Sequence, residues 1–294
     1  MIKQSTGDKF FEIINYFILA SIATIVIYPL WFVLAASISR PEDVLNGEMW
    51  LIPKHFSFVG YENLFENKEI LTGYLNTIFY TLSGTALNLV LTIMAAYPLS
   101  RTDFVGKHVI TAAIVFTTFF SGGLIPTYLL VKDLGMVNTF WAMIIPSAVS
   151  VWNIIIMRTF FQTSVPLPIQ EAASIDGCSN LQILWKIVLP LSMPIIAVMI
   201  LFYSVGHWNA FFNALIYLSD RDKYPLQLFL REILIQDRME QMLNVGDDSH
   251  AKTLMDAEAI KYAAVVVANL PVLMLYPFLQ RYFAKGMIIG AIKG

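Results

Sequence analysis

The chain has 294 residues, of which 57% are hydrophobic and 14% charged, and its net charge is −2. Soluble domains carry about 25% charged residues, so a large part of this chain does not face water. The nearly neutral balance indicates no nucleic-acid partner. The single cysteine, Cys178, excludes an internal disulfide framework, and the four scattered histidines have no metal-ligand spacing, so no metal site is predicted.

Six stretches of the chain contain no Asp, Glu, Lys or Arg, and they are 19 to 33 residues long. A helix needs about 20 residues to cross about 30 Å of hydrocarbon, and a charge at the bilayer centre costs roughly 2.5 to 3.5 kcal/mol. We therefore expect an all-α integral membrane protein that forms one domain, 1–294, with six transmembrane helices. The expected spans are 13–38, 71–99, 108–131, 136–158, 187–218 and 262–280.

The distribution of charges among the loops predicts the orientation of these spans. With both termini in the cytoplasm, the cytoplasmic parts hold nine basic and five acidic residues, a balance of +4. The outer parts then hold ten basic and sixteen acidic residues, a balance of −6. This fits the positive-inside bias, and the opposite topology would invert both signs.

Two long segments, 40–69 and 220–261, lie outside the membrane in this topology. In the second segment, apolar residues recur at helical spacing. They predict an amphipathic helix of about two to three turns. Packing of its apolar face on the membrane bundle is favoured over the alternative, a docking surface on the solvent side.

The fourth connection, 166–190, combines prolines and a glycine in an unusual order. Pro166 and Pro168 suit the start of a helix, and Gly177 suits its end because glycine adopts left-handed geometry at little cost. A short helix is therefore expected at 169–175, followed by a second helical stretch that leads into the fifth span. Such a segment is either a site that a partner protein binds and moves or a re-entrant helix-turn-helix between spans without a partner, and these features alone leave both open.

A motif within 166–190 is more specific. It has the form Glu-Ala-Ala-x3-Gly-x9-Ile-x-Leu-Pro, and it resembles the signature of the permease subunits of bacterial ATP-binding-cassette importers. Its fixed positions are Glu171, Ala172, Ala173, Gly177, Ile187, Leu189 and Pro190. Asp176 before the glycine is similar to the carbohydrate-importer branch of that family. The tail 276–294 resembles the maltose-importer inner subunit and, more closely, oligosaccharide permeases of the LplC type.

The resemblance implies that the membrane pathway and ATP hydrolysis belong to different subunits. The short helix would be a coupling helix seated in a groove of a separate ATPase, with Glu171 on the docking surface and Gly177 making the turn. This chain has no Gly-x4-Gly-Lys-Ser/Thr loop, so ATP and magnesium are expected on the ATPase dimer and no cofactor on this chain. The residues predicted to serve ATPase coupling are Glu171, Ala172, Ala173, Asp176, Gly177, Leu189 and Pro190.

The resemblance also implies further partners and a location. A second permease subunit is expected, as a heterodimer or a homodimer, together with an extracellular solute-binding protein that delivers the cargo. The expected cargo is a carbohydrate, in particular an oligosaccharide, and whether it is acidic stays open. The expected location is the bacterial cytoplasmic (inner) membrane.

Polar and aromatic residues within the spans are candidates for the substrate path, because sugars are held by aromatic faces and by amide or hydroxyl hydrogen bonds. Trp208, Phe211 and Phe212 are spaced about one turn apart, which predicts one side of a continuous helix. The alternative is that the amides bond between helices. His207 is expected to be a neutral hydrogen-bonding residue. The predicted path residues are Trp208, Asn209, Phe212, Asn213, Tyr203, Trp152 and Asn153, with Phe119 and Phe120 as weaker candidates.

Two other functions compete with the importer. An ion-coupled secondary transporter usually has ionisable residues within its spans, and the uncharged stretches contain no Asp, Glu, Lys or Arg. A membrane-embedded enzyme would need a nucleophile–base set, an acid–base pair or a metal cluster at membrane depth, and the sequence contains no such pattern. The permease subunit of an ATP-driven importer is therefore favoured, with no catalytic residue of its own.

Overall fold

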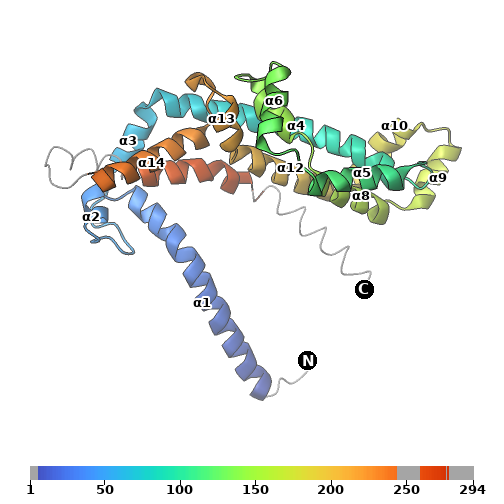
Figure 1. The fold of residues 1–294 in the computed structure, drawn as a ribbon. Helices are drawn as coiled ribbons and strands as arrows, with labels where there is room; N and C mark the ends of the chain where they lie inside the picture. The colour runs from blue at the N-terminus through green and yellow to red at the C-terminus, as the bar shows by residue number, and fades with distance from the viewer. Residues whose placement is uncertain (1–5, 244–258, 276, 278–294) are drawn as a thin grey trace. The chain divides into compact units, whose positions relative to one another are not determined.

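The computed structural model describes residues 6–243, 259–275 and 277, and this part of the chain is almost entirely helical (Figure 1). Its one β-bridge joins Ser39 and Phe56. The expected all-α class is therefore confirmed. The chain divides into two units, the first formed by 1–68 and 230–269 and the second by 69–229 and 270–294.

The first unit contains the long helix α1 (Thr6–Ser37), the short helices α2 (Pro41–Leu45) and α3 (Val59–Glu66), and the start of a helix at Ala259–Leu275. Most of the large apolar side chains of α1 are exposed. At its end, Ala35, Ala36 and Met49 form a small buried cluster against which Tyr262 packs.

The second unit is built around α4 (Lys68–Ser100), a single helix of 33 residues. One end of α4 meets the segment after the fifth predicted span, because Asn76 Nδ2 donates to the Asp222 carbonyl and Tyr80 donates to the Lys223 carbonyl. This segment contains η3 (Arg221–Lys223) and leads into α14 (Leu226–Leu243). α14 has 18 residues and is longer than expected, and Leu226, Leu228 and Phe229 at its start are buried.

Three of the predicted spans are not single helices, which corrects the sequence-based expectation. The span at 108–131 consists of α5 (Lys107–Phe119) and α6 (Leu124–Asp133), bent by 112°. The span at 136–158 consists of α7 (Phe140–Ile144) with η1 (Ile145–Ser147), followed after a 55° bend by α8 (Val151–Ser164).

The span at 187–218 is interrupted twice. The segment of α10 (Asn180–Ile183), the π-helical η2 (Leu184–Val188) and α11 (Leu189–Leu191) bends by 82° into α12 (Met193–Trp208). A second break separates α12 from α13 (Phe212–Tyr217). The assumption of one continuous helix through Trp208, Phe211 and Phe212 is therefore wrong.

By length and composition, two helices of the described part can cross a membrane alone, at Lys9–Ser37 and Lys68–Ser100, and the three bent pairs raise the number to five. The helix Ala259–Leu275 is apolar but shorter, and the rest of the predicted span 262–280 lies outside the described residues. The count of six and the orientation therefore stay predictions.

Candidate functional site

A row of polar side chains follows one side of α4 and faces the interior of the second unit. The residues recur every three or four positions, which places them on one helix face, and all are buried. They are Thr77, Thr81, Thr85, Asn88 and Thr92. Thr92 and Tyr203 of α12 share a hydrogen bond of 2.6 Å between their hydroxyl groups. The row therefore marks the side of α4 that packs against α12.

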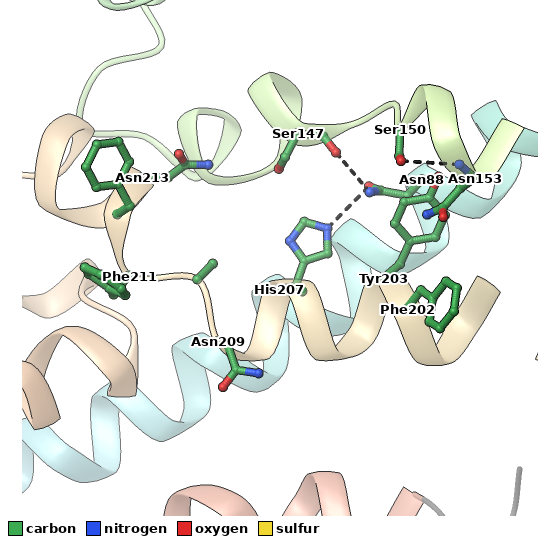
Figure 2. A pocket seen from close by; sticks show the side chains of 13 residues that line it. Asn88, Ser147, Ser150, Asn153, Phe202, Tyr203, His207, Asn209, Phe211 and Asn213 are labelled. Carbon is green, nitrogen blue, oxygen red and sulfur yellow. Dashed lines mark hydrogen bonds between the residues drawn. The ribbon is translucent and has the colours of Figure 1, made fainter. Parts of the chain in front are cut away.

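A cavity of about 370 Å³ opens beside this row, and we call it the Asn88 cavity (Figure 2). Its walls come from α4, from the turn between η1 and α8, and from the break between α12 and α13. The lining residues are Asn88, Ser147, Ser150, Asn153, Phe202, Tyr203, Gly206, His207, Asn209, Ala210, Phe211, Phe212 and Asn213. The described residues that line the cavity thus provide amides, hydroxyl groups, an imidazole and aromatic rings, and none of them is Asp, Glu, Lys or Arg.

A chain of hydrogen bonds joins the walls of the Asn88 cavity (Figure 2). Asn88 Nδ2 donates to the Ser147 carbonyl over 3.0 Å, and His207 Nε2 lies 3.3 Å from Asn88 Oδ1. Ser150 caps α8, since its Oγ accepts from the backbone N–H of Asn153 at 3.4 Å. Three separate elements are therefore held together around the cavity by neutral polar groups.

A second cavity, which we call the Ser121 cavity, adjoins the first. It has about 400 Å³ and includes Ser121 and Gly123, which lie at the break between α5 and α6. Ser147, Phe212 and Asn213 line both cavities. Three helix breaks therefore converge on one region of two adjoining cavities, lined by amides, hydroxyl groups and aromatic rings. Within a bilayer, irregular backbone is tolerated only where protein buries it or where it lines a water-filled cavity.

Most of the predicted path residues meet at this region. Tyr203, Asn209, Phe212, Asn213 and Asn153 all line the Asn88 cavity. In Figure 2 the amide of Asn209 points away from the His207 ring, and its Nδ2 donates to the Val205 carbonyl.

The two tryptophans predicted for the path line neither the Asn88 cavity nor the Ser121 cavity. Trp208 is buried, packs edge-to-face on Tyr74 at 5.6 Å between ring centroids, and lines a separate apolar groove. Trp152 is 72% exposed and lines another pocket, beside Ile155 and Thr159. Phe119 and Phe120, the weaker candidates, are exposed and line neither polar cavity.

The most informative cavity residues that sequence reasoning missed are Asn88, Ser147 and Ser150. The row of threonines with Asn88, at a helical period within an apolar span, was the available signal for the first of these. Ser147 and Ser150 lie at a helix break, and their position depends on that break, which the uncharged stretch does not reveal.

The predicted coupling segment begins with a short helix, α9 (Leu167–Ile175), whose first turn contains Pro168. Gly177 ends the turn that follows with a φ of +80°, a left-handed value that suits glycine. Ser179 then caps α10 in a capping box with Gln182. The local structure thus follows from proline, glycine and capping signals in the sequence.

The motif residues differ in exposure. Glu171, Ala172 and Asp176 are exposed, whereas Ala173 is buried in the cluster that contains Ile183 and Leu184. Leu189 is half-buried, and Pro190 is exposed at the start of the fifth predicted span. One face of the segment is therefore anchored, and the face that contains Glu171 is open to contact.

The predicted coupling segment is connected to the far end of α4. Arg101 Nη1 donates to Gln170 Oε1 of α9 over 3.2 Å, and the Tyr97 hydroxyl donates to the Asn180 carbonyl over 3.1 Å. Arg101 also donates twice to Asp103, and these hydrogen bonds hold the pKa of the Asp103 carboxyl below its usual value. A single helix, α4, thus contacts the coupling segment at one end and lines the Asn88 cavity further along.

Long apolar helices, interrupted where they surround cavities whose described lining residues include no Asp, Glu, Lys or Arg, are typical of a membrane transport protein. The model of the family described as "Binding-protein-dependent transport system inner membrane component" matches residues 2–289. The chain belongs to this family, so it is an inner-membrane permease subunit of a binding-protein-dependent transporter. The family resemblance inferred from the Glu171 motif is confirmed.

Individual proteins similar to this chain agree with that assignment. Protein LplC of Bacillus subtilis (strain 168) is 40% identical, over 99% of this chain and 97% of its own length. The polygalacturonan/rhamnogalacturonan transport system permease protein YtcP of the same organism is 42% identical, over 98% and 99%. A chain of a bacterial ABC transporter involved in the import of the acidic polysaccharide alginate matches with a TM-score of 0.86 and 33% identity, over 96% of this chain and all of that chain.

Proposed function

We propose that this permease subunit imports an oligosaccharide, of the acidic class in particular. The energy comes from a separate ATPase that binds α9. The Asn88 and Ser121 cavities are the observation that supports a sugar path, because they combine amides, hydroxyl groups and aromatic rings without a fixed charge. The acidic class rests on the relatives, since YtcP is named for polygalacturonan and rhamnogalacturonan and the solved transporter imports alginate.

ATP and magnesium belong to the partner subunits in this proposal, and this chain contributes no catalytic group. ATP binding would close the ATPase dimer, and α9 would transmit that movement to α4 through Arg101 and to the fifth span through α10. Transport is then a rigid-body switch of helices around the cavity. The purified chain alone is expected to hydrolyse no ATP.

The test of the cargo is uptake by the complete transporter in proteoliposomes, with its partner permease, ATPase and binding protein. Trigalacturonate and maltotriose are the probes, and internal ATP is supplied or omitted. The expected result is ATP-dependent uptake of trigalacturonate in preference to maltotriose. Uptake that needs a proton or sodium gradient instead of ATP would support the secondary transporter, and preference for maltotriose would contradict the acidic class.

The test of the coupling segment is Glu171→Ala, because that carboxylate is exposed on the face of α9 proposed to meet the ATPase. The variant is expected to insert normally but to lose most ATPase association and uptake. Asp133→Ala is the matched control, since it removes an exposed carboxylate at the end of α6 that is predicted to lie outside the cell. Normal ATPase association in Glu171→Ala would contradict the assignment.

A further inference from the structure

The Asn88 cavity contains one imidazole, His207, and its surroundings determine which ring nitrogen holds the proton. The Ser147 carbonyl can only accept a hydrogen bond, so the group of Asn88 that faces it at 3.0 Å is the donating Nδ2. The other side of this amide, Oδ1, is an acceptor and faces His207 Nε2 at 3.3 Å. The proton of a neutral imidazole therefore lies on Nε2.

A neutral imidazole with its proton on Nε2 has a lone pair on Nδ1, which can only accept. In Figure 2 this second nitrogen points away from Asn88 and toward the side of the cavity where Phe211 and Asn213 lie. His207 is buried, with a relative exposure of 7%. The ring therefore presents a single acceptor atom from an otherwise enclosed position.

The groups around the ring favour its neutral form. Besides His207, Tyr203 is the titratable residue among those that line the cavity, and its hydroxyl is bonded to Thr92. From α4 the ring is faced by Asn88 and by Gly84, and the Ser147 carbonyl of η1 accepts a hydrogen bond from Asn88. No carboxylate among the described lining residues is available to stabilise a protonated ring.

We infer that His207 Nδ1 accepts a hydrogen bond from a hydroxyl group of the transported sugar, and that Asn88 is the positioning residue that holds the ring in this tautomer. The inference rests on the proposed function and deepens it. An acceptor atom selects a hydroxyl and repels a carboxylate. If the cargo is an acidic oligosaccharide, its carboxylates lie elsewhere and one of its hydroxyl groups lies against His207.

The decisive variant is His207→Gln. A glutamine amide can reach the position of Nε2 and keep a donor toward Asn88 Oδ1, while it removes the acceptor at Nδ1. Loss of one hydrogen bond is worth about 0.5–1.5 kcal/mol, so the half-saturating sugar concentration for uptake should rise roughly 2- to 12-fold. The maximal rate should change less. Asn213→Ala serves as an independent variant of the same cavity.

A panel of sugars separates a contact from a structural role. The complete transporter is tested with trigalacturonate, maltotriose and derivatives of each that lack one hydroxyl group. For one hydroxyl position, its removal should weaken uptake by the wild type and leave uptake by His207→Gln unchanged. Equal losses in both proteins at every position would overturn the inference. If Asn213→Ala changes the uptake of these sugars while His207→Gln does not, the cavity remains the path and the inference alone fails.

A transporter that takes up neither trigalacturonate nor maltotriose would overturn the proposed function and this inference with it. The tautomer has its own test that does not need an active variant. In the wild-type complex with ¹⁵N-labelled histidine, the His207 signals, assigned by their loss in His207→Gln, should show a protonated Nε2 and an unprotonated Nδ1. Asn88→Leu should abolish this preference, and a proton on Nδ1 in the wild type would contradict the inference.

Discussion

The His207 ring packs against α4 at Gly84. A β-carbon at this position would collide with ring atoms of His207, including Nε2, the atom that faces Asn88. We predict that Gly84→Ala displaces the ring, breaks its contact with Asn88 and lowers stability by about 1–3 kcal/mol, the usual cost of overpacking. Thermal unfolding in detergent and uptake by the complete transporter measure the two effects.

Gly206→Ala is the matched control for Gly84→Ala in thermal unfolding, although Gly206 also lines the Asn88 cavity. It adds the same methyl group within α12, next to His207 in the sequence, where a β-carbon meets no other atom within 4 Å. A helical glycine replaced by alanine without a clash is expected to keep or slightly raise stability. If both variants unfold at the wild-type temperature, the close approach of α4 to the ring is not a constraint.

At the residue scale, the sequence predicted the positions of side chains whose own chemistry favours a cavity, and it missed positions that depend on a neighbour. Asn209, Asn213 and Asn153 were predicted because an amide in an apolar span needs a partner. Trp208 was misplaced because the helix ends there, so the next residues turn to the cavity while the indole packs on Tyr74. The two hydrogen bonds of Asn88 become evident only with Ser147 and His207 beside it.

At the scale of helices, the uncharged stretches predicted where the chain avoids water but not where its helices break. The absence of charged residues from a stretch reflects the free-energy cost of burying a charge in the bilayer. The position of a helix break depends instead on backbone geometry. The break between α5 and α6 contains Gly123 with a φ of +82°, and Ser150 caps the helix after the next break. Such glycine and serine signals are common in continuous membrane helices too. Only the partner helices determine that these three breaks meet.

The connection between α9 and α4 leads to a prediction about coupling. If movement of α9 reaches the cavity through the Arg101–Gln170 hydrogen bond, Arg101→Met should raise the number of ATP molecules hydrolysed per sugar transported. A hydrogen bond of about 0.5–1.5 kcal/mol corresponds to a roughly 2- to 12-fold change. Gln170→Leu should raise the same ratio, and the double variant should be no worse than the single ones.

Asp103→Asn distinguishes the two partners of Arg101. It weakens the ion pair of 2.8 Å between Arg101 and Asp103 but leaves Gln170 in place. Its ratio of ATP to sugar should therefore stay near that of the wild type. Fully additive effects of Arg101→Met and Gln170→Leu, or an equal effect of Asp103→Asn, would show that the connection to α9 does not transmit force.

At the scale of the whole molecule, the exposed apolar side chains and the low fraction of charged residues both indicate that much of the chain lies in a membrane. The window of α1 that is apolar enough to cross a membrane has 0% of its residues buried, whereas that of α4 has 28%. Apolar side chains exposed along most of a long helix are stable in lipid and not in water. α1 is therefore suited to face lipid or another subunit, while α4 brings its polar row to the interior.

The single cysteine provides a test of orientation for the complete chain. Cys178 is partly exposed and lies just after α9, in the segment predicted to face the cytoplasm. A thiol reagent that does not cross membranes should label it in inside-out vesicles and leave it unlabelled in intact spheroplasts. Glu66→Cys in a Cys178→Ser background should behave in the opposite way, because Glu66 is exposed at the end of α3 in a segment predicted to be external. Labelling of Cys178 from outside would show that the topology is the inverse of the predicted one. α9 would then lie out of reach of a cytoplasmic ATPase, so the orientation predicted from the positive-inside bias and the coupling proposal would both be wrong.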